Sequence, residues 1–93
     1  TYLSEKEKEA ALVLSRAVAL GESMVRAGET ATAPIVAAMV KLIEAEPLAK
    51  IDYVKAVDGV TVTPVDAVAA GTLFAMAVYI GKTRLIDNFI VGA

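Results

Sequence analysis

The sequence contains no cysteine and no histidine. The lack of cysteine excludes a disulfide framework, a thiol nucleophile and a cysteine-based zinc site. Aromatic residues make up only 5% of the 93 residues, whereas 57% are apolar, so the core must be built mainly from Ala, Val, Ile and Leu. This apolar share is high for so small a body, and it favours a protein whose apolar surface partly faces a partner.

The chain also lacks an excess of charge of one sign and a long apolar run. Its formal net charge is −2, with acidic and basic residues interspersed, so we expect no nucleic-acid binding. The apolar run from Leu73 to Ile80 is far shorter than the ~20 residues of a membrane-spanning helix, so no membrane segment is expected. The polar and acidic start, Thr1 to Glu9, does not resemble a signal peptide. We therefore expect one cytoplasmic domain, residues 1–93.

Two segments show the apolar spacing of three and four residues that is typical of amphipathic helices. Ser4 and Glu7 have the form of a capping box, which predicts that the first helix begins there and ends at Gly28. The second helix is expected to begin at Thr32 and to end before Pro47, antiparallel to the first. The buried stripes are predicted to comprise Leu3, Ala10, Leu14, Ala17, Val18, Gly21, Met24 and Val25, and then Ile35, Met39, Leu42 and Ile43.

After Lys50 the apolar period changes to two, which predicts a strand that ends at Asp58-Gly59. The segment from Val60 to Ala70 is too irregular for an assignment. Strict alternation along the strand places its side chains on two faces: Ile51, Tyr53 and Val57 on one, and Asp52, Val54 and Ala56 on the other.

Two further strands, Leu73–Ile80 and Thr83–Val91, flank Gly81-Lys82, which suits a type II′ hairpin turn because glycine accepts a positive φ. The predicted fold class is α+β, with two antiparallel helices packed on a three-stranded antiparallel sheet. The predicted cross-strand pairs are Tyr79 with Arg84, Val78 with Leu85 and Phe74 with Phe89.

Both faces of this hairpin are apolar. The face with small side chains, which include Ala75 and Ala77, suits the close approach of a helix. Two helices cannot cover both faces, so we expect the other face to associate with a second copy in a symmetric pair. That face comprises Phe74, Met76, Val78, Leu85 and Phe89, and the small-residue face comprises Leu73, Ala75, Ala77, Ile86 and Ile90.

Arg84, Asp87 and Asn88 are the most suggestive polar set, because such groups can bind a carboxylate or a phosphate. In an extended strand, however, Arg84 and Asp87 point to opposite faces, so we interpret Asp87 and Asn88 as partners of backbone groups or of an interdomain contact. Gly81-Lys82-Thr83 lacks the spacing of a phosphate loop. We assign no catalytic, cofactor-binding or metal-binding residue, and interpret as solvated surface Glu44, Glu46, Asp52, Asp58, Lys6, Lys8, Arg16 and Arg26.

Three segments together resemble one known family. They are Tyr2-Leu3-Ser4, Ile51-Asp52-Tyr53 and the stretch Gly81 to Asn88, which contains Arg84-Leu85-Ile86-Asp87-Asn88. In this order they resemble the C-terminal domain of the pantothenate synthetase family, the pantoate–β-alanine ligases. The resemblance covers essentially the whole sequence but only about the last third of the family's enzyme. It therefore implies a lid-like C-terminal domain whose N-terminal nucleotide-binding domain is absent from this chain.

The resemblance also implies what the parent enzyme does. It joins pantoate to β-alanine through a pantoyl adenylate, with ATP converted to AMP and diphosphate and with Mg²⁺ as cofactor. The family holds ATP with a His-x-Gly-His type motif and a Ser-Arg-Asn type segment that precedes the Tyr-Leu-Ser; neither is expected in this chain, which has no histidine. The expected partners are thus the N-terminal domain and, through it, ATP and the two substrates, with a homo-oligomer also expected. The isolated chain is expected to be inactive.

Two other interpretations remain open at this point. The chain could instead be a free-standing, non-catalytic α+β module that associates with itself or with another protein through its apolar sheet. A small-ligand binder would require a concave polar pocket, which the sequence gives no reason to expect.

Overall fold

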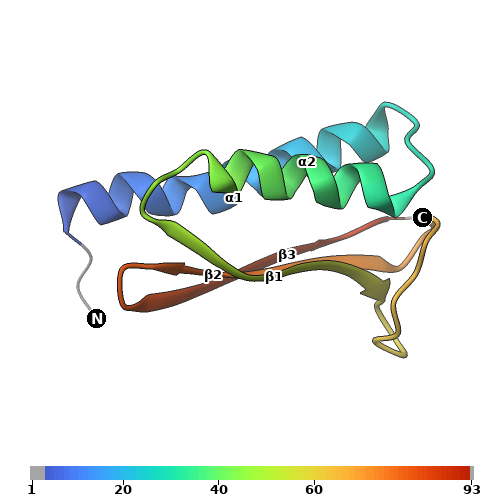
Figure 1. Cartoon of the computed structure of the whole chain (residues 1–93). Coiled ribbons are helices and arrows are strands. Elements are labelled where there is room, and N and C mark those ends of the chain that lie inside the picture. Colours follow the sequence, from blue (N-terminus) through green and yellow to red (C-terminus); the bar gives the residue numbers. More distant parts are fainter. Residues whose placement is uncertain (1–3, 93) are drawn as a thin grey trace.

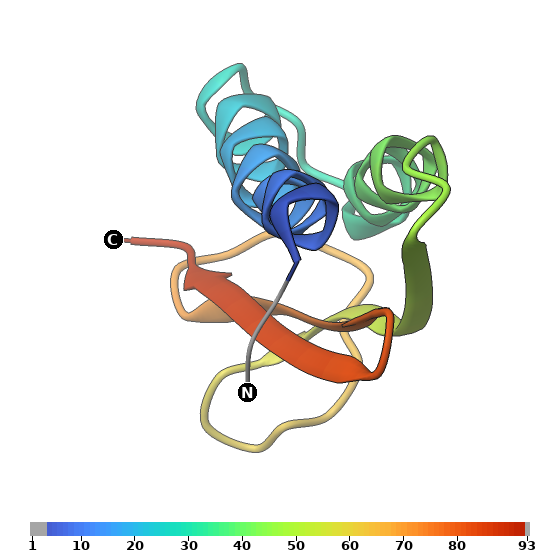
Figure 2. The same ribbon diagram turned by 90° about the vertical axis from the view of Figure 1, so that its left-hand side faces the viewer.

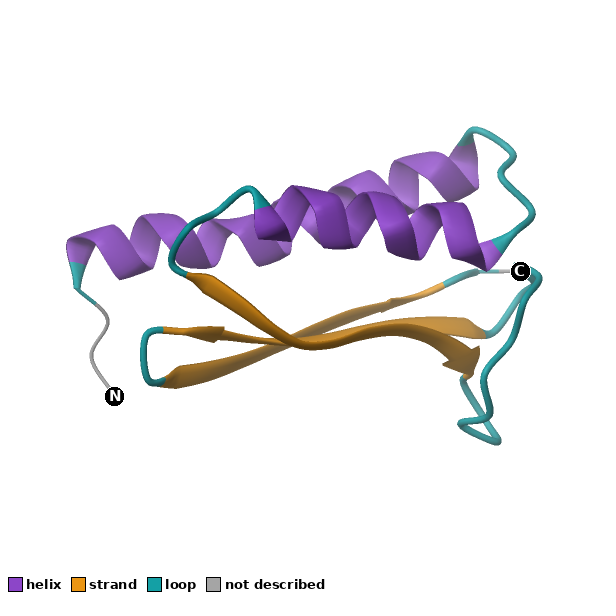
Figure 3. Ribbon diagram, viewed as in Figure 1, coloured by secondary structure: helices purple, strands orange, loops and turns teal. Residues whose placement is uncertain are grey.

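A computed structural model describes residues 4–92 of the chain. The three strands form one antiparallel sheet in the order β1-β2-β3, and both helices lie on the same face of it, antiparallel to each other (Figures 1 and 2). The predicted α+β architecture is thereby confirmed, and Figure 3 shows its two layers. The elements in chain order are α1 (Glu5–Arg26), α2 (Thr32–Glu44), β1 (Ala49–Asp58), β2 (Thr72–Ile80) and β3 (Thr83–Ile90).

Both ends of α1 are formed by local sequence signals. The Glu7 amide donates to Ser4 Oγ at 3.2 Å and the Ser4 amide donates to Glu7 Oε1 at 2.9 Å, which is the predicted capping box. Gly28, at φ 100°, follows the last turn, and its amide donates to the Val25 carbonyl at 3.1 Å. This is the left-handed glycine that commonly ends helices. Leu3, predicted as part of the buried stripe, and Tyr2 lie outside the described residues.

The start of α2 is secured by the connection between β1 and β2. The N-cap position is Ala31, which has no capping side chain. Instead, the Thr32 amide donates to the Asp66 carbonyl at 3.0 Å and the Thr32 hydroxyl donates to the Val65 carbonyl at 2.7 Å. The second half of the segment that the sequence left unassigned therefore packs against the beginning of α2.

A β-bulge in β1 changes the predicted faces of this strand. The register with β2 shifts between Ile51 and Tyr53, which pair with Val78 and Ala77, and Asp52 is the extra residue. Ile51 consequently shares the helix-facing side with Val54, which pairs with Met76. The prediction that Ile51 lies on the same face as Tyr53 is wrong, because a bulge reverses the alternation of side chains beyond it.

The hairpin of β2 and β3 has the predicted register. The pairs Tyr79 with Arg84, Val78 with Leu85 and Phe74 with Phe89 are all present. Gly81 has a φ of 61°, and it is the only one of the two turn residues with a positive φ, as a type II′ turn requires.

The core lies between the helices and the large side chains of the sheet. The Phe74 and Phe89 rings stack at a centroid distance of 4.8 Å, and Phe74 is fully buried. The opposing helix surface contributes small residues, of which Ala17 and Gly21 are buried. The core also contains Val13, which the predicted stripe omitted, together with Ala10, Leu14, Ile35, Met39, Ile43, Ala56, Met76, Val78 and Ile80.

The prediction about which hairpin face the helices cover is therefore wrong. The sequence favours helices on the face of Ala75 and Ala77, and a second copy on the face of Phe74 and Phe89. The helices instead cover the Phe74 face, because α1 itself supplies the small side chains that allow the two layers to approach closely. Phe74 is 0% exposed and Phe89 is 8% exposed, so neither is available to a second copy.

Candidate functional site

Within residues 4–92 both helices lie on one face of the sheet, so the opposite face, which we call the outer face, has no helix over it (Figures 1 and 2). Its members follow from the strand register, since directly paired residues project to the same side. They are Lys50, Tyr53, Lys55 and Val57 of β1, Leu73, Ala75, Ala77 and Tyr79 of β2, and Arg84, Ile86, Asn88 and Ile90 of β3.

An ion pair crosses this outer face from β3 to β1. Arg84 donates to Asp52 Oδ2 from Nε at 3.1 Å and from Nη2 at 2.9 Å, and these hydrogen bonds raise the pKa of Arg84. The side chains are 40% and 39% exposed, so solvent screens the pair. Sequence reasoning missed the partnership because it depends on the bulge. In this structure two nitrogen atoms of the guanidinium donate to the Asp52 carboxylate.

Tyr53 lies under two cations of the outer face. Lys55 Nζ is 4.7 Å from the centre of its ring and Arg84 Cζ is 5.9 Å from it. Both distances lie within the range of cation–π attraction. These residues therefore form a cluster in which aromatic surface and positive charge lie side by side, and two of them, Tyr53 and Arg84, are of the types enriched at protein interfaces.

The polar set suggested by the sequence does not form one site. Arg84 pairs with Tyr79 on the outer face, whereas Asp87 pairs with Met76 on the helix-facing side, as the alternation predicted. The Asp87 carboxylate accepts the amide of Asn88 at 2.8 Å. This bond agrees with the backbone role expected for Asp87; the corresponding expectation for the Asn88 side chain, and the alternative of an interdomain contact, stay predictions.

The loop after β1 is ordered by Asp58. Its Oδ1 accepts the amides of Thr61 at 2.9 Å and Val60 at 2.8 Å, and these bonds lower the pKa of the carboxyl group. The Asp58 amide donates to the Thr63 carbonyl, and the Val62 amide donates to the Asp58 carbonyl, both at 2.8 Å. Asp58 thus holds a tight loop, and Asp52 is paired with Arg84, so the two carboxylates do not act together as an acid and a base.

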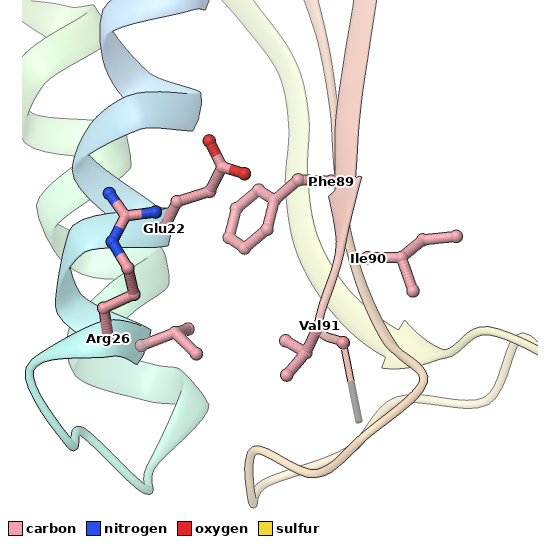
Figure 4. A pocket seen from close by; sticks show the side chains of 7 residues that line it. Glu22, Arg26, Phe89, Ile90 and Val91 are labelled. Carbon is pink, nitrogen blue, oxygen red and sulfur yellow. The ribbon is translucent and has the colours of Figure 1, made fainter.

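A shallow pocket of about 270 Å³ lies between the end of α1 and the end of β3 (Figure 4). Glu22 and Arg26 line its helix side, and Phe89 and Val91 line its strand side; Ile90 also borders it, although its side chain points away from the helix. Its volume falls just below the usual range for sites of drug-sized ligands. Arg26 is exposed, so the pocket has a charged rim but no buried polar group that would fix a ligand.

A second hollow runs along the other end of the helix layer. Two adjoining cavities of about 470 and 270 Å³ share Arg16 and Glu46. Lys6 and Glu9 add one charge of each sign, so the hollow offers balanced rather than positive charge. Lys8, another cation of α1, lies outside this hollow, and its Nζ is 4.0 Å from Glu5 Oε1. The hollow therefore offers no surplus of positive charge for a phosphate.

The part of the chain that the structure describes offers neither a metal cluster nor a membrane span. Within residues 4–92, no three acidic side chains gather closely enough to hold a metal ion. In the same range, neither helix combines the length and the apolar character needed to span a bilayer.

Comparisons with known proteins give a consistent result. The family model described as Pantoate-beta-alanine ligase matches residues 1–90. The pantothenate synthetase of Ruminiclostridium cellulolyticum is 51% identical over 89 residues, which are 96% of this chain and 32% of that protein. That of Heliobacterium modesticaldum is 49% identical over 90 residues, which are 97% of this chain and 32% of that protein.

The fold is similar as well. The crystal structure of pantothenate synthetase from Thermus thermophilus matches with a TM-score of 0.89 at 29% identity, covering 99% of this chain and 33% of that one. The chain thus spans about a third of the length of the relatives that it matches.

Proposed function

Because the chain belongs to the pantoate-beta-alanine ligase family, we propose that it is the C-terminal domain of a pantothenate synthetase and closes over an active site built by the rest of that enzyme. The observation that carries this proposal is the coverage, since 96% of this chain corresponds to only 32% of a relative at 51% identity. A chain this similar to one third of an enzyme is expected to have the same role as that third of the enzyme.

In this proposal the whole enzyme joins pantoate to β-alanine through a pantoyl adenylate, and ATP is converted to AMP and diphosphate. The described residues of this chain do not fit ATP phosphates or Mg²⁺, because they bring together neither an acidic cluster nor a cationic pocket with buried donors. We therefore assign both to the rest of the enzyme and assign no chemical step to this chain.

The contribution that we propose for this domain is closure. Covering a reaction site excludes water, which limits hydrolysis of a reactive adenylate and strengthens polar contacts inside the site. The fold supports such a role, because its helix-facing core is complete in itself and leaves the outer face for contact with a second body.

The test replaces the matched 89 residues of the R. cellulolyticum enzyme by this chain. We expect the chimera to form pantothenate and to catalyse pantoate-dependent exchange of diphosphate into ATP. The chain alone is expected to show no exchange, and the R. cellulolyticum enzyme without its matched residues is expected to form pantothenate at least tenfold more slowly than the chimera.

Two results would contradict the proposal. Exchange by the purified chain alone would place adenylation within these residues. A folded chimera no more active than the truncated enzyme would favour the free-standing interaction module instead.

A further inference from the structure

Exposed apolar side chains gather on the side of the molecule opposite the helices. Ile86 and Ile90 on the outer face are 61% and 63% exposed. Val60 and Val62 are 91% and 61% exposed, and their loop turns away from the helix layer in both views (Figures 1 and 2). The bridge between Val57 and Pro64 anchors this loop to the edge of the outer face. Loop residues 58–63 and the outer face therefore form one surface.

The loop holds a strained residue at this surface. Val62 has a φ of 60°, a left-handed conformation that β-branched residues rarely adopt. The hydrogen bonds of Asp58 hold it there, although Asn or Gly would adopt the same backbone with less strain. Strained residues of this kind cluster where proteins contact ligands or partners. An exposed valine in a strained position is therefore an argument that this loop belongs to a contact surface.

The charge of the outer face indicates what covers it. Lys50, Lys55 and Arg84 lie on it, and the acidic residues of the same surface are Asp52, which pairs with Arg84, and Asp58 of the loop. The surface therefore has a surplus of one positive charge, although the whole chain carries a net charge of −2. A second copy related by a two-fold axis would bring two such positive surpluses together, which disfavours it. A surface complementary to this one would be apolar and would carry acidic side chains.

We propose that the outer face, together with loop residues 58–63, is the surface on which the rest of the pantothenate synthetase docks. This inference rests on the proposed function, because the partner is the two thirds of the relatives' length that this chain does not cover. The contact buries Ile86, Ile90 and Val62 against an apolar surface, and acidic groups of the partner meet Lys50 and Lys55.

Because the chain contains no cysteine, a single introduced thiol reports on this contact. Ile86→Cys is prepared in the chain alone and in the R. cellulolyticum chimera, and the rate of its reaction with N-ethylmaleimide is followed by mass spectrometry of the labelled peptide. Leu12→Cys is the matched control, because Leu12 is 53% exposed but lies on α1. Each rate is measured with and without ATP, Mg²⁺ and pantoate.

We expect the thiol at position 86 to react at least tenfold more slowly in the chimera than in the chain alone, in one or both ligand states. The thiol at position 12 is expected to keep its rate within twofold. Equal rates at position 86 in every state would overturn the inference, as would protection at position 12 instead. Slower labelling of Ile86→Cys as the isolated chain is concentrated would also overturn it, since the occupant would then be a second copy.

Failure of the proposed function is recognised separately. An inactive but folded chimera contradicts the proposed function, whereas an active chimera with an unprotected position 86 contradicts only the docking inference. If the chimera does not fold, the same two thiols are placed at the aligned positions of the R. cellulolyticum enzyme. The labelling rates in that enzyme are then compared with those in the chain alone, and the same tenfold and twofold criteria test the docking inference.

Discussion

On the helix-covered face of the sheet Phe74, Met76 and Val78 are fully buried, whereas on the outer face Ile86 and Ile90 remain more than half exposed. Both faces of the β2 strand are largely apolar in sequence. They differ in side-chain size along β2, where large residues point to the helices and Ala75 and Ala77 point outward. The helices thus cover the sheet face with the large side chains, because these pack closely against the small residues of α1.

The most direct test of this difference removes one large side chain from each face. Phe74→Ala is expected to lower the free energy of unfolding by about 3–5 kcal/mol, because it empties part of a close-packed core. Ile86→Ala, at an exposed position, is expected to change it by less than about 0.5 kcal/mol. Urea denaturation of both variants measures the two values. Similar losses at both positions would mean that the outer face is also covered in the isolated chain.

The sequence predicted those parts of the fold that local chemistry determines. The capping box of Ser4, the left-handed Gly28 and the turn at Gly81 each depend on a few neighbouring residues, and all three are present. The choice of sheet face depends instead on whether large side chains find small partners elsewhere in the chain, and it was predicted wrongly. The bulge at Asp52 also escaped prediction, because it depends on pairing with β2.

The candidate site was predicted less completely than the fold. Alternation correctly separated Arg84 from Asp87. The partnership of Arg84 with Asp52 joins residues that lie 32 positions apart, and no local pattern indicates it. The strained Val62 could not be predicted either, because its backbone is imposed by hydrogen bonds to Asp58 that form only when the loop closes.

Gly21 tests how closely α1 approaches the covered face. A Cβ atom at this position would lie 2.8 Å from the Phe89 ring and 2.9 Å from Met39 Sδ. Gly21→Ala is expected to lower the free energy of unfolding by about 1–2 kcal/mol. Overpacking costs about 1–3 kcal/mol, and this outweighs the gain of up to about 1 kcal/mol from the higher helix propensity of alanine. The reverse exchange at an exposed position, Ala19→Gly, is expected to lose about 1 kcal/mol by propensity alone. A stabilised Gly21→Ala variant in a thermal melt would show that the layers stand further apart.

Gly81 tests the tip of the hairpin, where the sheet passes beneath the start of α1. Gly81→Val is expected to lower the free energy of unfolding by about 1–2 kcal/mol, because a β-branched residue is strained at the left-handed φ of 61°. Lys82→Val, one position later, is expected to change stability by less than about 0.5 kcal/mol. An added side chain at position 81 would also meet the Glu7 carboxylate. Because Glu7→Ala alone removes half of the capping box, the double variant is compared with it: equal thermal midpoints of Glu7→Ala with and without Gly81→Val would assign the loss to that collision rather than to backbone strain.

The smallest expected effect on stability is that of Asp58. Its carboxylate makes the stability of the loop beside the outer face depend on pH, whereas the apolar packing of the covered face does not. Its carboxylate accepts the amides of Thr61 and Val60, which lower its pKa in the folded state. A lowered pKa means that the contribution to stability is fully present above the unfolded-state pKa, about 4, and is lost as the pH falls through the folded-state pKa.

We therefore expect the wild-type chain to lose more stability below about pH 4 than Asp58→Asn, whose amide oxygen still accepts both bonds but does not titrate. Asp66→Asn, in the same connection between β1 and β2, controls for the loss of one negative charge. Urea midpoints between about pH 2.5 and 6 measure the three slopes. If Asp58→Asn kept the wild-type slope, the Asp58 bonds would not order the loop in solution, and Val62 would then have no fixed position beside the outer face.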